Sequence, residues 1–429
     1  MLLFRSLPLG LILLIADATP SSASLIPRAI EKLHGVALKH TKSLARDLRV
    51  AFGGILVAQQ PPSSNTHAVY CKPGRSGSLG GAAAGNSTSS VSPSGTSRAG
   101  PSSTKSSSGA NQTGSSLPSS PWKLIETHQG TNFYDGWTFF IGPDTPTQGI
   151  VEYVDEGTAR ANGLLEVNSA GNAIMRVETT PNVPDLRKSI RITTNTQFNG
   201  GLVVMDAVHM PTGCGTWPAF WTNGPNWPHG GEIDIVEAVH DYTNNQMTIH
   251  TDTGCRLPSS DVNVLKISGN VIGGTDCAAL TTGNQGCGIR SSLSNSFGAG
   301  FNRNGGGTYA MQWDGSGISV FFFPRGSEPD DITNDVPRPE TWGPAQARWP
   351  ADSCDPFKFF SDHSAIFDTT LCGQWAGSVW NAAGIPGQEQ SCAQRTGVST
   401  CEAFVRANGA AFSEAYWEVR YVKIYQFKG

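Results

Sequence analysis

Short apolar runs with polar residues at alternate positions recur throughout residues 122–429. They are separated by turns rich in Gly, Pro and Asn, and include GIVEYVD (149–155), GGLVVMDAVHM (200–210) and YWEVRYVKIYQF (416–427). A period of two residues is typical of strands that bury one face and expose the other. Within 122–429 we find no segment of comparable length with helical period. The pattern therefore predicts an all-β fold, a sandwich of two antiparallel sheets.

Composition and charge support this interpretation and restrict the partners. The chain has 50 Gly, 27 Pro and only 15% charged residues, which is typical of a turn-rich β protein. Of its 30 Lys and Arg and 34 Asp and Glu, 11 and 3 precede residue 122. This leaves 19 basic and 31 acidic residues in 122–429. An acidic domain is a poor partner for nucleic acid and suits a neutral ligand.

The first 121 residues divide into three segments. Residues 1–23 resemble a secretory signal peptide, with Arg5 before an apolar run at 7–16 that is too short to span a bilayer. Residues 24–60 form a basic amphipathic segment, either a propeptide or solvated arm, or a membrane or cell-wall attachment. Residues 61–121 are a Ser/Gly/Pro-rich linker, expected to be disordered and glycosylated, with sequons at Asn86 and Asn111. We find no transmembrane segment in the sequence, and expect a soluble, secreted, extracellular monomer.

Eight of the nine cysteines lie in the part of the chain that is expected to fold, from Cys214 to Cys401. An even set in a secreted chain predicts disulfides, but the sequence does not choose among the pairings. The spacings do not resemble a zinc site, because the sequence has no CxxC pair. Cys71 is left either free or paired with another chain.

The stretch GGEIDIVEAVH (230–240) carries three carboxylates that are out of phase with a regular strand. Alternation places Glu232 and Asp234 on one face but would bury Glu237 in the core, at a cost of several kcal/mol if it is ionised. A β-bulge at Ile235–Val236 would return Glu237 to the face of the other two acids. The phase error therefore predicts a bulge and three acids on one sheet surface.

Three neighbouring acids raise one another's pKa. Retaining glycoside hydrolysis needs such a set, because it uses one ionised nucleophile and one protonated acid, with carboxyl groups about 5–5.5 Å apart. The alternatives are scattered surface acids or a calcium site. The residues alone do not decide which Glu has which role.

GGEIDIVEAVH resembles the E-x-D-x-x-E signature of glycoside hydrolase family 16, in its fungal laminarinase-type endo-1,3(4)-β-glucanase branch. Further stretches share the resemblance, among them GTWPAFWTNGPNWPHGGEIDIVE, NQMTIHTDTGC, CGQWAGSVW and YWEVRYVKIYQ. The resemblance covers residues 122–429. It implies a catalytic domain with a β-jelly-roll fold and a concave substrate cleft. It also implies Glu232 as nucleophile, Asp234 as helper and Glu237 as acid/base.

Aromatic and polar residues near these acids are candidates for substrate binding. Sugar C–H groups pack on flat apolar faces, and Trp227 and Trp221 lie just before the acids. Trp217 is expected to belong to the core. The resemblance adds Trp375, and it places His250 near the acids. Arg191, on an alternating strand, is a further candidate for reaching the cleft, and Asn223 and His229 are weaker ones.

Together these features predict a secreted endo-β-glucanase that hydrolyses β-1,3 or mixed β-1,3/1,4 glucan with retention, through a covalent glycosyl-enzyme. A β-glucan transglycosylase and a non-catalytic glucan-binding protein are the alternatives, and galactan specificity is a third. No cofactor and no catalytic metal are expected. Structural calcium occurs in some relatives, but no motif supports it here.

Overall fold

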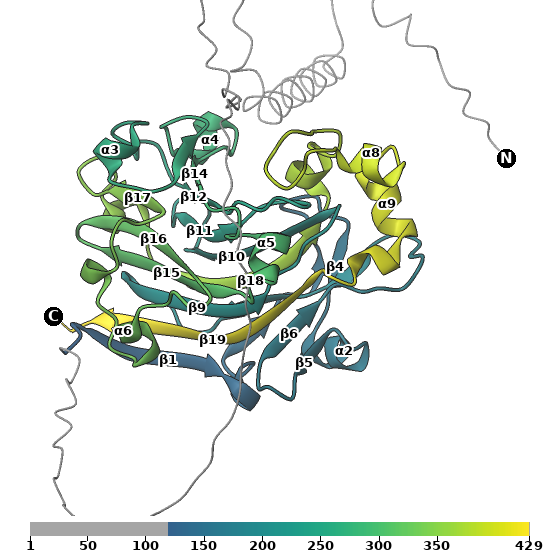
Figure 1. Ribbon diagram of the computed structural model, residues 1–429, viewed down its shortest axis with the longest axis horizontal. Helices are drawn as coiled ribbons and strands as arrows, with labels where there is room; N and C mark the ends of the chain where they lie inside the picture. The colour runs from purple at the N-terminus through teal and green to yellow at the C-terminus, as the bar shows by residue number, and fades with distance from the viewer. Residues whose placement is uncertain (1–118, 429) are drawn as a thin grey trace, which may run out of the picture. The chain divides into compact units, whose positions relative to one another are not determined.

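The computed structural model describes residues 119–428 (Figure 1). The predicted segments 1–23 and 24–60, nearly all of the 61–121 linker, both sequons and Cys71 lie outside the described residues. Within 119–428, no helix is long and apolar enough to cross a membrane.

Two large antiparallel sheets form the domain (Figure 1). Sheet A has the order β17 (Ala347–Pro350), β16 (Gly317–Pro324), β15 (Gly307–Asp314), β9 (Gly201–His209), β19 (Tyr416–Phe427), β6 (Ala173–Arg176) and β5 (Leu165–Val167), with β1 (Trp122–Gln129) also paired to β19. Sheet B has the order β13 (Asn270–Ile272), β14 (Cys287–Arg290), β12 (Gln246–His250), β11 (Glu232–Glu237), β10 (Thr216–Asn223), β18 (Ser364–Leu371), β8 (Arg191–Thr194) and β2 (Trp137–Phe139). A small third sheet joins β3 (Gly142–Pro143), β4 (Val151–Tyr153) and β7 (Arg187–Ser189).

Neighbouring strands come from distant parts of the chain, as in β9–β19 and β10–β18. The all-β jelly-roll sandwich predicted from the sequence is confirmed, and the quoted apolar runs contain β4, β9 and β19. Alternation within β19 shows why these residues form strands. Val422 and Ile424 lie in the core between the sheets, whereas Tyr421 packs on the opposite face.

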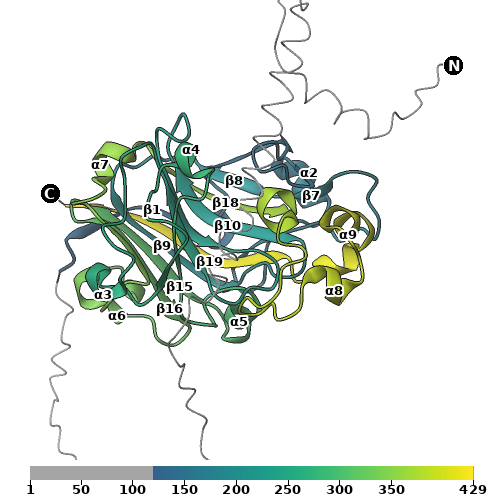
Figure 2. The ribbon, with the colours of Figure 1, turned by 90° about the horizontal axis from the view of Figure 1, so that it is seen from above.

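Helices are short and lie in the connections. The α-helices are α2 (Glu156–Ala161), α3 (Val262–Leu265), α4 (Ala279–Thr282), α5 (Gly298–Arg303), α6 (Asp330–Thr333), α7 (Pro356–Phe359), α8 (Cys392–Thr396) and α9 (Cys401–Ala407). Single turns of other helix types are η4 (Gly130–Asn132), η5 (Pro339–Thr341), η6 (Gly373–Gly377) and η7 (Gly409–Phe412). Figure 2 shows α8 and α9 together at one end of the sandwich, and α3 and α6 at the other.

Four disulfides bind the connections to the sheets: Cys214–Cys392, Cys255–Cys354, Cys277–Cys287 and Cys372–Cys401. The prediction that these eight cysteines form disulfides is confirmed. Two of the four fasten the segment with η6, α8 and α9 to the ends of β10 and β18. This segment has little regular structure of its own, so the cross-links restrict where it can lie.

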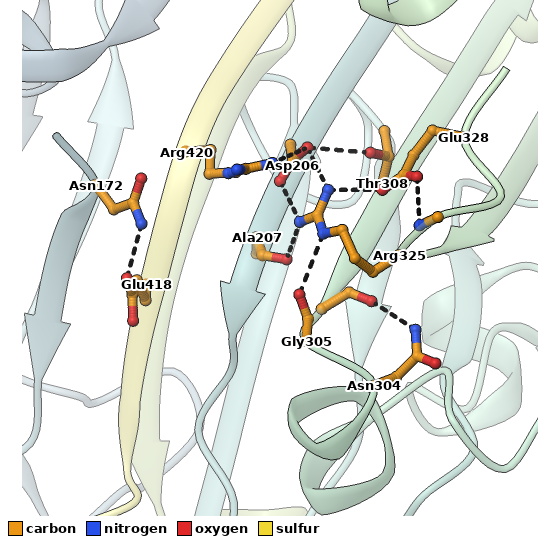
Figure 3. A network of polar contacts seen from close by, with 12 residues as sticks. Asn172, Asp206, Ala207, Asn304, Gly305, Thr308, Arg325, Glu328, Glu418 and Arg420 are labelled. Carbon is orange, nitrogen blue, oxygen red and sulfur yellow. Dashed lines mark hydrogen bonds and ion pairs between the residues drawn. The ribbon is translucent and has the colours of Figure 1, made fainter. Parts of the chain in front are cut away.

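A polar network covers the face of sheet A that points away from sheet B (Figure 3). The guanidinium of Arg325 donates to both carboxylate oxygens of Asp206, at 2.8 and 2.6 Å. It also donates to the carbonyl oxygens of Gly305 and Ala207 and contacts Glu328. The Asp206 side chain is only 5% exposed. Arg325 therefore supplies the charge that makes a buried carboxylate tolerable, and it ties the loop after β16 to the sheet.

Replacing Arg325 by Ala should lower the free energy of unfolding by about 3 kcal/mol, because the buried Asp206 would keep only the more distant Arg420, at 3.9 Å, as a positive partner. Arg338→Ala is the control, since Arg338 pairs with the exposed Glu340, and it should change stability by less than about 1 kcal/mol. Denaturant titrations followed by tryptophan fluorescence measure both values. Equal effects of the two substitutions would show that the Asp206 pair has no special role.

Candidate active site

Strand β11 lies in the middle of sheet B, between β10 and β12, and its pairing contains the predicted bulge. Asp234 pairs with Thr248 and Glu237 with Gln246, so Ile235 and Val236 together face a single residue of β12. On the β10 side the register also shifts, because Trp221 pairs with Asp234 and the preceding Phe220 with Val236. The bulge at Ile235–Val236 is confirmed.

The bulge separates acids from apolar residues. Ile233, Ile235 and Val236 are fully buried in the core between the sheets. Glu232, Asp234 and Glu237 lie on the other face of sheet B, which we call the open face. Strand pairing then aligns side chains of the open face in three rows across the sheet, one through each acid. The rows are Ser364, Asn223, Glu232 and His250; Ile366, Trp221, Asp234 and Thr248; and Arg191, Asp368, Ala219, Glu237 and Gln246.

Glu237 lies in a desolvated position with one strong hydrogen-bond donor. The indole N–H of Trp217 donates to its Oε1 at 2.7 Å. Burial and the negative charge of Asp234 raise the pKa of Glu237 well above its ordinary value, and the Trp217 hydrogen bond opposes this rise. Trp217 was expected to serve only the core. It packs against the core but also contacts the acid.

Glu232 and Asp234 share a histidine. The Nε2 atom of His250 lies 3.4 Å from Oδ2 of Asp234 and 3.8 Å from Oε1 of Glu232. Burial and the charge of Asp234 raise the pKa of Glu232 to about 7, while His250 lowers it. Burial tends to lower the pKa of His250, but the two carboxylates outweigh burial and raise it. The sequence placed His250 near the acids, and the structure brings it into contact with two of them.

Trp227 lies in the loop between β10 and β11 and is 40% exposed. With Asn223 and Ser364 it lines an open cavity of about 330 Å³ at the Glu232 end of the rows. Its indole also lowers the pKa of Glu232 through a hydrogen bond. Next in the loop, His229 pairs with Asp252 after β12, at 2.5 Å. The loop thus presents an aromatic face beside the acid.

Trp221 and Arg191 lie together at the other side of the open face. The Arg191 guanidinium lies 5.1 Å from the Trp221 ring centre and 5.2 Å from that of Phe140. Trp375 is farther out. It is on η6 and meets Trp217, the hydrogen-bond donor to Glu237, edge to face at 5.6 Å between ring centres.

Asp368 is a fourth carboxyl group of the site that the sequence reasoning missed. It lies on β18, beside Arg191 and two strands away from Glu237. Burial raises its pKa to about 7; Arg191 opposes the rise, and Asp144 adds to it. The run SAIFDTTL around it does not alternate, because Ile366 is apolar and in phase with Asp368, so the sequence carried no clear signal for this residue.

Two groups of donors among residues 119–428 are close enough to hold a cation. One consists of Glu232, Asp234 and His250, and the other of Asp241 with Cys214 and Cys392. The two cysteines of the second group are joined in a disulfide, which removes their thiolates as ligands. The first group is the acid cluster itself.

Similarity to known proteins agrees with this geometry. The family described as "XgeA-like, catalytic GH16 domain" matches residues 137–425. A probable endo-1,3(4)-beta-glucanase of Aspergillus niger is 40% identical over 313 residues, which are 72% of this chain but 40% of that protein. The chain thus spans less than half the length of this relative.

Solved structures match over the same part of the chain. Laminarinase 16A from Phanerochaete chrysosporium, with beta-glucans in its donor and acceptor sites, is 36% identical with a TM-score of 0.63, covering 71% of this chain and 99% of that one. An elongating family 16 beta-1,3-glucosyltransferase is 37% identical with a TM-score of 0.64, covering 71% and 100%. The chain belongs to glycoside hydrolase family 16.

Proposed function

We propose that the protein is a secreted endo-β-glucanase that hydrolyses β-1,3 or mixed β-1,3/1,4 glucan with retention of configuration. The observation that carries this proposal is the bulge in β11, which places Glu232, Asp234 and Glu237 on one face of sheet B. Burial and the charge of Asp234 raise the pKa of both glutamates, that of Glu237 well above its ordinary value and that of Glu232 to about 7. Glu237 has a neutral donor, Trp217, which leaves the protonated acid favoured there, whereas His250 beside Glu232 favours its ionised form. A retaining glycosidase needs this combination of a protonated acid and an ionised nucleophile.

The proposed roles use this difference in partners. Glu237 donates its proton to the glycosidic oxygen as the bond from C1 breaks, while a carboxylate oxygen of Glu232 forms a bond to C1. In the second step Glu237, now a carboxylate, takes a proton from water, and the water oxygen replaces Glu232 at C1. Asp234 lies between them, and its charge favours the protonated form of both neighbours. His250, when protonated, places a positive charge beside Glu232 and Asp234.

The substrate class rests on chemistry and on relatives. The acidic balance of residues 122–429 suits a neutral polymer. Trp227 offers an exposed ring for sugar C–H groups beside Glu232. Trp221, Arg191 and Trp375 are proposed as further contacts along the open face. The names of the related proteins point to β-1,3 and β-1,3(4) glucans.

The compartment is proposed from the disulfides and the sequence of the first residues. Four disulfides in residues 119–428 suit an oxidising environment outside the cytosol. A signal peptide at 1–23 would deliver the chain there, and we expect a monomer.

Transfer to a second sugar is the alternative with specific support, because one related structure is a glucosyltransferase. Both reactions share the glycosyl-enzyme and differ only in whether water or a sugar hydroxyl attacks C1. A protein that binds glucan without cleaving it fits less well, since all three acids are present.

The full chain with laminarin, followed by proton NMR, tests the proposal. Cleavage inside the polymer should release oligosaccharides. Their new reducing ends should appear first as the β-anomer. First appearance of the α-anomer would contradict retention, and longer chains without new reducing ends would indicate transfer. Glu232→Ala and Glu237→Ala should each lower hydrolysis by about 10²-fold or more, whereas Glu340→Ala, at an exposed surface position, should not. Full activity of either acid variant would show that the site is elsewhere.

The Trp217 hydrogen bond provides a pH test of the same assignment. Its loss in Trp217→Phe removes a donor that favours ionised Glu237, so the pKa of Glu237 should rise further. The alkaline limb of kcat/KM should therefore move to higher pH, and kcat should fall roughly tenfold because the forming carboxylate loses its donor. Trp342→Phe is the matched control, since the Trp342 indole also donates to a carboxylate, that of Asp331 in α6, which is not one of the three acids. An unmoved alkaline limb in Trp217→Phe would contradict Glu237 as the acid.

A further inference from the structure

The bulge in β11 leaves backbone groups without partners in the sheet. Because Ile235 and Val236 face one residue of β12, the regular ladder of hydrogen bonds between these strands is interrupted. The carbonyl oxygen of Ile235 and the N–H of Glu237 flank this interruption. Both groups are in the interior of the domain, where an unpaired polar group is unfavourable.

Asn245, the residue immediately before β12, binds both groups with its side chain. Its Oδ1 accepts from the N–H of Glu237 at 2.9 Å, and its Nδ2 donates to the carbonyl oxygen of Ile235 at 2.9 Å. The orientation of the amide is fixed by chemistry, since one partner can only donate and the other can only accept. One side chain thus replaces the missing rungs on either side of the bulge.

Asn245 is itself held in place. It is fully buried, and its N–H donates to Oγ of Ser296 at 2.9 Å. Its carbonyl oxygen accepts from the N–H of Ser291 at 2.8 Å. Ser296 in turn donates to the carbonyl oxygen of Leu293 at 2.7 Å. The amide therefore belongs to a connected buried network that limits its movement.

From this geometry we infer that Asn245 is a positioning residue for the general acid/base, which fixes the bulge and so aims the Glu237 carboxyl at the glycosidic oxygen. The inference rests on the proposed role of Glu237. The side-chain hydrogen bonds of Asn245 to β11 go to backbone atoms and not to the carboxyl oxygens of Glu237. It acts on the backbone from which that side chain projects, and a shift of about 1 Å at a catalytic group can cost on the order of 10²-fold in rate.

A misplaced acid/base gives a kinetic signature that a general loss of folded structure does not give. Laminarin has a poor leaving group and needs a proton in the first step, whereas 2,4-dinitrophenyl β-laminaribioside does not. The second step still needs Glu237 to take a proton from water. Azide needs no such help: it bonds to C1 as the bond from C1 to Glu232 breaks, which releases a β-glycosyl azide.

For Asn245→Ala we expect kcat/KM on laminarin to fall about a hundredfold. On the dinitrophenyl glycoside, kcat/KM should stay near the wild-type value, while kcat and KM fall together and azide restores kcat. Asn245→Asp, which is isosteric and keeps the acceptor for Glu237 but loses the donor to Ile235, should show the same pattern. It serves as the second variant if the alanine variant folds poorly.

Asn244→Ala is the matched control. Asn244 is the preceding residue, is also buried, and donates to the carbonyl oxygen of Ser291 rather than to β11. In this variant any change in kcat/KM should be the same for laminarin and for the dinitrophenyl glycoside, and azide should not change kcat. Glu237→Ala, measured alongside, should show the full signature.

The outcomes separate the two proposals. If Glu237→Ala lacks the signature, Glu237 is not the acid/base and the proposed mechanism fails. Alternatively, Glu237→Ala shows the signature while in Asn245→Ala kcat/KM falls by the same factor on both substrates, or does not fall on laminarin. In either case Asn245 has only a structural role and the inference is overturned.

Discussion

The site depends on one irregularity, the bulge at Ile235–Val236. A regular strand cannot place Glu232, Asp234 and Glu237 on one face, because successive side chains alternate. The extra residue reverses the alternation between Asp234 and Glu237, so Ile233, Ile235 and Val236 all enter the core while the three acids share the open face. Without it, either Glu237 or the apolar residues would lie on the wrong side. The same irregularity has a cost, because it removes regular strand pairing, and Asn245 offsets that cost with two side-chain hydrogen bonds.

Electrostatics then divides the acids. Burial and mutual repulsion raise the pKa of both Glu232 and Glu237, but their neighbours differ. His250 lies beside Glu232 and favours its charged form, whereas Glu237 has a neutral donor, Trp217. A positive group is a stronger counterweight to desolvation than an indole N–H. This difference in partners favours an ionised Glu232 and a protonated Glu237, as the proposed roles require.

Features governed by local periodicity could be predicted from the sequence, and features governed by distant contacts could not. The two-sheet sandwich and the bulge follow from alternation and its single phase error. The pairing of the eight cysteines does not, since it joins residues far apart in the chain. Asp368 and Trp217 were missed for the same reason: each is one residue of an ordinary strand, and only cross-strand alignment brings it to the acids. Asn245 was missed because its partners are backbone atoms.

The choice between hydrolysis and transfer does not lie in the acids. In the proposed mechanism Glu237 serves both the departing sugar and the attacking acceptor, so the groups beside Glu237 influence whether water or a sugar hydroxyl attacks. On one side these groups are Trp217 and, packed edge-on against it, Trp375 of η6. The segment of η6 is tied to the sheet through Cys372 and the neighbouring disulfides. Because a cross-linked segment cannot easily move aside, Trp375 is held against Trp217, and both rings keep a fixed position beside Glu237.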